Sequence, residues 1–343
     1  MAVEHTEDPA RVLVTGAGGA AGIAVIRALS PAGHAVYAAD CDPLATGLHI
    51  VPRSRRCLLP RGDDPRFASA LLGECRRRGI DVVVPTVDEE LRPLADARHL
   101  FAEHGVVVLS SEAEALATCL DKHALVEAVR GIVPCPATEL LDPWFEPEAW
   151  IFPVIVKPRT GRGGAGVELV ADAAGLDRFP HDGSHIVQEH LPGEEYSVDV
   201  LVDHGGAVVA AVPRVRLRVE SGVAVVARTV RDADLEAAAG RCAQAAGIRG
   251  GANVQFRRDA DGVARLLEIN PRFPGTLAIT VASGVNLPTL ALADALGVPL
   301  PDDAGVFAEI GMVRMLEDVV VDVRDLEVPA ASTSSPADTL SVA

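Results

Sequence analysis

Two stretches of the sequence decide the fold, PVIVKPRTGRGGAG at residues 153–166 and LLEINPRFPGT at residues 266–276. The first is a short apolar run that ends at Lys157 and leads into a loop with four glycines. Glycines there let backbone N–H groups approach phosphate oxygens and let the loop close as a lid. In the second stretch, Glu268 and Asn270 stand two residues apart and therefore share one face of a strand. The two stretches predict a phosphate-binding loop and an oxygen-rich strand face.

The oxygen-rich face extends to the preceding strand. The runs ANVQF and ARLLEIN flank the dipeptide Asp261-Gly262, which is preferred in the two-residue type I′ turn of a β-hairpin. With that turn, Gln255 stands opposite Glu268 on the neighbouring strand. Two positions further along, Asn253 stands opposite Asn270. Carboxylate and amide oxygens gathered on one face suit Mg²⁺, which is held by few protein oxygens together with phosphate.

Polar residues also alternate with apolar ones along two other predicted strands. In EEYSVDVLV, the two-residue period puts Glu195, Ser197 and Asp199 on one face. The run VPRVRLRVESG carries three arginines with the same spacing: Arg214, Arg216 and Arg218. They are candidate ligands of a substrate carboxylate, and the alternative is an exposed stripe in an arginine-rich chain. SGVNLP, from Ser283, is expected to close the floor of the substrate pocket.

The N-terminal third has the alternating pattern of a doubly wound α/β domain. The apolar run RVLVT enters GAGGAAG at residues 16–22, a helical pattern follows, and a second strand ends at Asp40. Strands and helices alternate to about residue 110. The glycines and Asp40 also fit a dinucleotide site with Asp40 on a ribose. The alternative is that the glycines only permit a tight turn and close helix packing.

Composition argues against several classes of protein. The chain of 343 residues predicts two or three domains. A net charge of −17 disfavours nucleic acid or an anionic membrane as partner. The apolar runs are too short to span a bilayer and the start MAVEHTEDPA lacks the pattern of a secretory signal, so we expect a cytoplasmic protein. The 6 cysteines are scattered, which favours reduced thiols over zinc ligands or disulfides.

The basic residues are skewed towards arginine. Of 31 lysines and arginines, only Lys122 and Lys157 are lysines. A compact ammonium and a planar guanidinium are not interchangeable at a tightly packed anion. The two lysines are therefore candidates for positions that arginine cannot fill, and the alternative is chance survival.

The ordered set of motifs resembles an ATP-grasp enzyme: CLDKHAL, PVIVKPRTGRGGAG, IVQEHLPGEEYSVD, NVQF and LLEINPRFPGT. The resemblance is greatest to the branch of the carbamoyl phosphate synthetase large subunit and D-alanine-D-alanine ligase. It implies a fold that combines α/β and α+β parts, in which a Rossmann-like pre-ATP-grasp domain precedes a two-subdomain ATP-grasp fold with antiparallel sheets. The expected boundaries are residues 1–110 for the first domain, 111–190 for the small subdomain with the connector and Gly-rich lid, 191–327 for the large subdomain with the Mg²⁺ site, and 328–343 for a disordered tail.

The resemblance also implies roles for individual residues. Lys122 and Lys157 are expected to reach the α- and β-phosphates of ATP, and Lys157 and Arg272 to act on the γ-phosphate and the acyl phosphate. The rest of the expected nucleotide set, from lid to hinge to ribose ligand, is Arg162, Gly163, Gly164, Gln188, Glu189, His190, Leu191 and Glu195. One or two Mg²⁺ ions, or Mn²⁺ in their place, are expected on Gln255, Glu268 and Asn270.

The implied activity is ATP-dependent carboxylate–amine ligation, which forms an amide through an acyl phosphate and releases ADP and phosphate. The expected partners are a small carboxylate and an amine, with Arg214, Arg216 and Ser283 nearest the carboxylate. A homodimer is a further possible assembly, because no residue pattern determines the oligomeric state. The alternatives are an NAD(P)-dependent oxidoreductase that uses GAGGAAG, an inactive nucleotide sensor, and another ATP-grasp chemistry such as thiol ligation or carboxylation.

Overall fold

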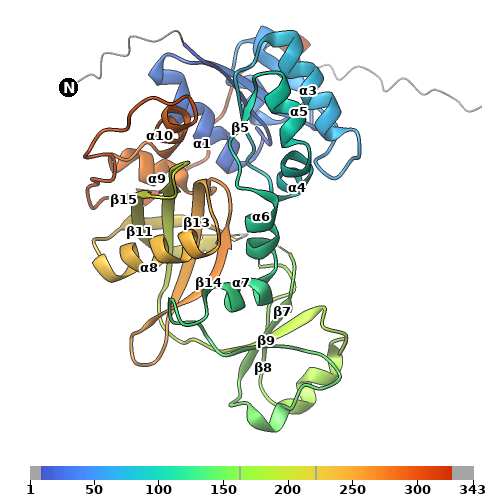
Figure 1. Ribbon diagram of the computed structural model, residues 1–343, viewed down its shortest axis with the longest axis vertical. Coiled ribbons are helices and arrows are strands. Elements are labelled where there is room, and N and C mark those ends of the chain that lie inside the picture. Colours follow the sequence, from blue (N-terminus) through green and yellow to red (C-terminus); the bar gives the residue numbers. More distant parts are fainter. Residues whose placement is uncertain (1–8, 162–163, 221, 327–343) are drawn as a thin grey trace, which may run out of the picture.

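A computed structural model describes residues 9–161, 164–220 and 222–326. These residues form three sheets, of five, six and four strands. The five-stranded and four-stranded sheets lie at opposite ends of an elongated molecule, and the six-stranded sheet lies between them (Figure 1). The predicted fold class is confirmed. The boundaries at residues 110 and 190 stay predictions, and the tail predicted for residues 328–343 lies outside the described residues.

The N-terminal sheet is parallel, in the order β3-β2-β1-β4-β5. Its strands are β1 (Arg11–Val14), β2 (Ala35–Asp40), β3 (Arg56–Leu58), β4 (Val82–Val84) and β5 (Val107–Val108). The helices of this part are α1 (Ala20–Leu29), α2 (Thr46–His49), α3 (Phe67–Arg78), α4 (Asp88–Asp96) and α5 (Arg98–Glu103). The apolar residues of β1 (Val12, Leu13 and Val14) and the three valines of β4 are buried, as expected for a parallel sheet that helices cover on both faces.

Contacts within this domain hold the glycine loop between β1 and α1. The Gly18 N–H donates to the Asp40 carboxylate at 2.8 Å, and the other oxygen of Asp40 accepts from the Asp42 N–H at 3.0 Å. A Cβ at Gly22 would lie 2.4 Å from the Gly16 carbonyl oxygen. The glycines are thus needed for close packing, and Asp40 is occupied by the loop itself. Both findings favour the packing interpretation over a dinucleotide site.

Two short helices lead to the four-stranded sheet. They are α6 (Ala113–Leu120) and α7 (Lys122–Val129), and Asp121 separates them because its carboxylate caps α7 by accepting from the His123 and Ala124 N–H groups at 3.0 and 3.1 Å. The sheet is antiparallel, in the order β6-β9-β7-β8. Its strands are β6 (Thr138–Leu140), β7 (Val154–Pro158), β8 (Glu168–Val170) and β9 (His185–Glu189).

The six-stranded sheet is antiparallel, in the order β14-β13-β10-β11-β12-β15. Its strands are β10 (Glu195–Val202), β11 (Val208–Glu220), β12 (Val223–Thr229), β13 (Gly250–Arg258), β14 (Ala264–Asn270) and β15 (Gly311–Val313). Helix α8 (Ala233–Ala245) packs on one face, against the side of β10 that carries Tyr196, Val198 and Val200. The opposite side of β10 carries Glu195, Ser197 and Asp199, as predicted.

The loop of the β13–β14 hairpin differs from the prediction. Instead of a two-residue turn at Asp261-Gly262, three residues, 260–262, connect the strands, and the Asp259 N–H donates to the Val263 carbonyl at 2.9 Å. The Asp259 carboxylate accepts from the Asp261 and Val263 N–H groups at 3.0 and 2.9 Å. This side-chain turn competes with the type I′ turn, and Gly262 supplies the left-handed residue that the longer loop needs, at φ +80°.

A β-bulge at Leu267 cancels the extra loop residue. Near the loop the pairing is shifted by one residue, so that Phe256 stands opposite Leu266. Past the bulge, Gln255 stands opposite Glu268, and Asn253 stands opposite Asn270. The predicted pairs are therefore confirmed, although the predicted turn was wrong.

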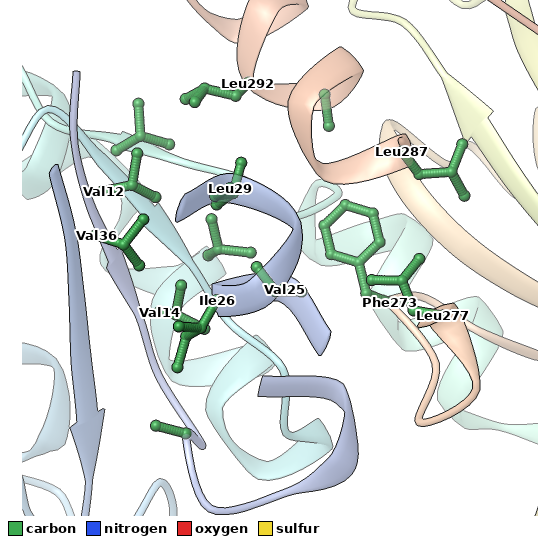
Figure 2. Packing of buried hydrophobic residues seen from close by; sticks show 14 of the residues in the cluster. Val12, Val14, Val25, Ile26, Leu29, Val36, Phe273, Leu277, Leu287 and Leu292 are labelled. Carbon is green, nitrogen blue, oxygen red and sulfur yellow. The ribbon is translucent and has the colours of Figure 1, made fainter. Parts of the chain in front are cut away.

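The C-terminal part of the chain returns to the N-terminal domain through helices α9 (Leu277–Ala282) and α10 (Leu287–Ala295). In Figure 2, Ile26 of α1 lies on the side of Val14 of the sheet. Val25 of the same helix lies on the side of Phe273 and Leu277. This shared core fixes the loop after β14 against the N-terminal domain. Among the described residues, no helix combines the length and apolar character needed to cross a bilayer.

Candidate nucleotide and carboxylate site

A cavity of about 290 Å³ lies where the four-stranded sheet faces the six-stranded sheet. It gathers eight of the ten predicted nucleotide-binding residues: Lys122, Lys157, Gly164, Gln188, Glu189, His190, Leu191 and Glu195. The other two, Arg162 and Gly163, lie outside the described residues. Residues distant in the sequence thus meet at the place that the motifs predict, and we call it the nucleotide cavity.

Both lysines of the chain line this cavity and are almost fully buried. Lys122 Nζ donates to the Gly161 carbonyl, in the glycine-rich loop that follows Lys157, at 3.0 Å. Burial lowers the pKa of Lys157 to about 8, against the opposing effect of the Glu268 charge. Burial also lowers the pKa of Lys122. Burial of two ammonium groups is costly unless anions compensate them, and a polyphosphate would supply those anions.

The side chains expected near adenine and ribose have protein partners. The Gln188 amide donates to Thr138 Oγ1 at 2.9 Å and is 2% exposed. Glu195 forms an ion pair with Arg216, whose Nη2 also donates to the Gly222 carbonyl at 2.7 Å. A ribose would therefore share Glu195 with a guanidinium, which joins a predicted nucleotide ligand to a predicted substrate ligand.

The oxygen-rich strand face separates the nucleotide cavity from a second cavity of about 140 Å³. Gln255 and Glu268 border both cavities, whereas Asn253 and Asn270 line the second. The Asn270 amide donates to Glu268 Oε1 at 3.1 Å, and the Gln255 amide donates to Asn253 Oδ1 at 3.2 Å. These bonds use N–H groups of Gln255 and Asn270 and leave the side-chain oxygen of Asn270 available to a hard cation, whereas Gln255 Oε1 also accepts from Arg216 Nη1 at 3.4 Å.

The donor set fits Mg²⁺ better than a soft metal. Within the part of the chain that the structure describes, no group of three or more His, Cys, Asp or Glu side chains could hold a metal ion. The predicted ligands Gln255, Glu268 and Asn270 include one carboxylate and two amides. Mg²⁺ tolerates so few protein ligands because phosphate oxygens and water complete its octahedron. The ion and the nucleotide would therefore bind together.

The three arginines of β11 do not act as one stripe. Arg214 is 1% exposed and lines the second cavity, and Arg216 lines both cavities. Arg218 is exposed and lines neither, because irregular pairing after Arg216 breaks the alternation. Ser283 also lies outside both cavities, and its hydroxyl donates to the Thr280 carbonyl at 2.8 Å. The expectation for Ser283 was wrong because this serine ends α9 by bonding back to it.

Arg272 lines the second cavity, as the predicted γ-phosphate contact should. Its Nε and Nη2 donate to the two oxygens of Asp88 at 2.7 and 2.9 Å. Asp88 is the first residue of α4, so this bidentate ion pair joins the N-terminal domain to the strand face. Both side chains are largely buried. The bidentate bond to the Asp88 carboxylate fixes the plane of the Arg272 guanidinium. It therefore sets the orientation of Arg272 at the second cavity.

Two family models match the chain. "PylC-like, N-terminal domain" matches residues 12–109, which contain the parallel sheet. "ATP-grasp in the biosynthetic pathway with Ter operon" matches residues 182–318, which contain the oxygen-rich strand face and Arg272. The chain belongs to the ATP-grasp superfamily.

Relatives of this ATP-grasp protein are similar over long stretches. The carbamoyl phosphate synthase large chain of Thermus thermophilus is 26% identical over 310 residues, which are 82% of this chain and 30% of that protein. Carnosine synthase 1 of Gallus gallus is 32% identical over 178 residues, 43% of this chain and 19% of that one. The chain thus spans less than a third of the length of these curated relatives.

Solved structures show the same fold. A biotin carboxylase from Campylobacter jejuni superposes with a TM-score of 0.69 at 17% identity, covering 87% of this chain and 73% of that one. An L-amino acid ligase from Bacillus licheniformis gives 0.67 at 16% identity, covering 87% and 78%. At such identities the likeness concerns the ATP-grasp fold alone.

Sequence reasoning missed several residues that line the nucleotide cavity, among them Ile155, Arg257 and Leu267, and it missed Asp88, which holds Arg272. Leu267 lines the nucleotide cavity because the bulge carries it there, and no sequence pattern signalled the bulge. Asp88 was missed because its partner Arg272 lies 184 residues away. Its position directly after a predicted parallel strand was the available signal, since strand ends of such sheets carry functional residues.

Proposed function

We propose that this ATP-grasp protein is an ATP-dependent carboxylate–amine ligase that works through an acyl phosphate. The observation that carries the proposal is the meeting of both lysines with Glu268 and Gln255 around one cavity. Two buried cations on one side and an oxygen-rich face on the other match the needs of a polyphosphate and its metal ion. The names of relatives, among them carnosine synthase and an L-amino acid ligase, support amide formation.

The chemistry requires activation because a carboxylate has no adequate leaving group for an amine. A carboxylate oxygen forms a bond to the γ-phosphorus, and the bond from that phosphorus to the bridging oxygen breaks with release of ADP. The amine then attacks the acyl carbon, phosphate leaves, and the proton lost from nitrogen goes to phosphate or water. The products are the amide, ADP and phosphate.

Like charges oppose the first step. A carboxylate about 4 Å from a phosphate oxygen is repelled by roughly 4 kcal/mol per charge pair at an effective dielectric of 20. Lys157 and Arg272 are the residues of this chain that would offset it, and Gln255, Glu268 and Asn270 would hold Mg²⁺, which supplies further positive charge when bound. By closing as a lid, the glycine-rich loop after Lys157 would keep water from the acyl phosphate.

The test is a screen of amino acids and small carboxylates with Mg²⁺, ATP and hydroxylamine, which traps acyl phosphates as hydroxamates. We expect hydroxamate, ADP and phosphate in equal amounts with at least one acid. Stoichiometric AMP and pyrophosphate would contradict the proposal. Binding of NAD(P) in the absence of ATP would favour the oxidoreductase alternative, against which the occupied Asp40 carboxylate argues.

A further inference from the structure

One row of polar residues crosses four adjacent strands of the six-stranded sheet. Glu268 pairs with Gln255, Gln255 with Ser197, and Ser197 with Arg214. Adjacent strands lie about 4.8 Å apart, so Arg214 starts about 10 Å from the backbone of Gln255 on the same face. The row therefore continues from the side of the nucleotide cavity into the second cavity, with Arg214 at its end.

Arg214 is buried without enough partners. Its Nη1 lies 2.5 Å from Asp199 Oδ2, and both side chains are at most 1% exposed. Asp199 is already served by Asn253 and Thr280, whose side chains donate to it at 2.8 and 2.6 Å. Among the described residues, Nε of Arg214 has no hydrogen-bond partner, and Nη1 has only its ion-pair contact with Asp199, which lacks hydrogen-bond geometry. Buried guanidinium N–H groups are costly when unpaired, so a ligand that accepts from them would remove a penalty.

The second cavity also limits what that ligand is. Its volume of about 140 Å³ is less than half of the roughly 300 Å³ at which sites for drug-sized ligands begin. The apolar side chains in its lining are Val223, Ala224 and Pro274, all small. The cavity also borders Gln255 and Glu268, so the end of a metal-bound triphosphate would occupy part of it.

We propose that the second cavity holds the acyl-donor substrate, that Arg214 binds its carboxylate, and that the cavity selects compact acids over bulky ones. The inference rests on the ligase function proposed above. A guanidinium binds a carboxylate through charge-assisted hydrogen bonds, and Arg214 offers them at the end of a row that begins at the predicted metal ligands. One carboxylate oxygen is held by Arg214, and the other faces the γ-phosphorus.

Binding is measured without turnover, by saturation-transfer NMR with full-length protein, Mg²⁺ and a non-hydrolysable ATP analogue. The probes are acetate, glycine and, as the bulky acid, diphenylacetate. We expect acetate or glycine to bind wild type and diphenylacetate not to bind. Arg214→Gln should weaken binding of the compact acid at least tenfold. Arg218→Gln is the matched control, because Arg218 lies on the same strand but is exposed, and it should bind as wild type does.

Arg214→Gln leaves Asp199 buried without its cation, so the variant is paired with the double variant Asp199→Asn/Arg214→Gln, which removes both charges. Retained binding of the ATP analogue shows that each variant is folded. The inference is overturned if acetate binds Arg214→Gln or the double variant as it binds wild type, if neither compact acid binds wild type, or if diphenylacetate binds as well as acetate.

Parallel assays of ADP release separate this inference from the ligase proposal. Acid binding that depends on Arg214 but gives no ADP or hydroxamate would support Arg214 as the carboxylate ligand and contradict the ligase function. Acid-dependent ADP release with an unchanged KM for the acid in Arg214→Gln would support the ligase function and overturn the role of Arg214 as the carboxylate ligand.

Discussion

The two glycine loops of this chain have similar composition and opposite surroundings. In the loop at residues 16–22, an added Cβ would collide with other atoms, for example 2.2 Å from Val87 Cγ2 at Gly16. In the second loop, Gly164 has a φ of +73°, a Cβ added there would meet nothing within 4 Å, and the residue lines the nucleotide cavity. Gly16 and Gly22 of the first loop leave room for neighbouring atoms, whereas Gly164 of the second loop has open space and supplies a left-handed backbone beside the cavity. Gly166, where a Cβ would lie 2.9 Å from Pro158, is the exception in the second loop.

The loop at residues 16–22 nevertheless helps to build the site beside the second loop. Val87, which packs on Gly16, directly precedes Asp88, and Asp88 holds Arg272 at the second cavity. Packing thus explains these glycines without a nucleotide, and Gly16, Gly19 and Asp40 also line a cavity of about 190 Å³. The loop is part of the support that delivers a carboxylate to a site on another domain.

The prediction with the largest expected effect tests the packing of the loop at residues 16–22. Gly22→Ala places a methyl group 2.4 Å from the Gly16 carbonyl oxygen, so backbone must move, and we expect a loss of stability of about 3 kcal/mol. Differential scanning calorimetry of the purified variants measures it. Gly164→Ala is the control: it has a strained φ but open space, and should cost only about 1 kcal/mol. Equal losses would contradict the distinction between the loops.

The second prediction tests Lys157, which precedes the loop that contains Gly164. Lys157→Arg keeps the charge but puts a planar, larger group at a 6% exposed position, and we expect ADP release to fall about ten- to a hundredfold. Lys122→Arg should be milder, since Lys122 lies on a helix with more room to adjust. Arg178→Lys, an exposed change in the same part of the chain, should leave the rate unaltered. Near wild-type turnover by folded Lys157→Arg protein would refute this interpretation.

The third prediction concerns pH. Burial lowers the pKa of Lys157 to about 8, and bound phosphates favour the charged form. Above pH 8 the free protein has lost this proton and must take one up on binding, so the dissociation constant for Mg²⁺-ATP should rise about tenfold per pH unit. Below pH 8 this dependence should vanish. Isothermal titration calorimetry between pH 7 and about 9.5 checks it, and Lys157→Met should abolish the slope. A flat profile in wild type is the contrary result.

The smallest effect tests the link between the two regions. Asp88→Asn removes one charge of the bidentate pair with Arg272, and we expect kcat to fall about tenfold with little change in the KM for ATP. Asp88→Glu should recover part of the loss, because a carboxylate is restored. A merely structural role would instead lower the melting temperature and raise the KM for ATP, so both are measured alongside kcat.

The sequence predicted the strand faces better than the connections. Period-two alternation identified the partners Gln255 and Glu268, because burial of the opposite face forces every second residue outward. It failed at Arg218, where the pairing is irregular. The separate expectation for Ser283 did not come from alternation, and there a helix end captures the hydroxyl. The Asp88–Arg272 pair depends on how two domains pack, and no local pattern encodes that.

The β13–β14 hairpin has a consequence for changes in length. Along a strand, position has parity: removing one residue exchanges the inner and outer faces of everything beyond it. The third loop residue and the bulged Leu267 are one extra residue each, and together they restore parity at Glu268. Deleting Leu267 alone would remove the bulge and still leave Gln255 opposite Glu268, and deleting one residue of 260–262 would shorten the loop to two residues with the bulge in place. A shortening by one residue is therefore tolerated at the bulge or in the loop, whereas a deletion between Asp259 and Gln255 would exchange the faces of the residues beyond it.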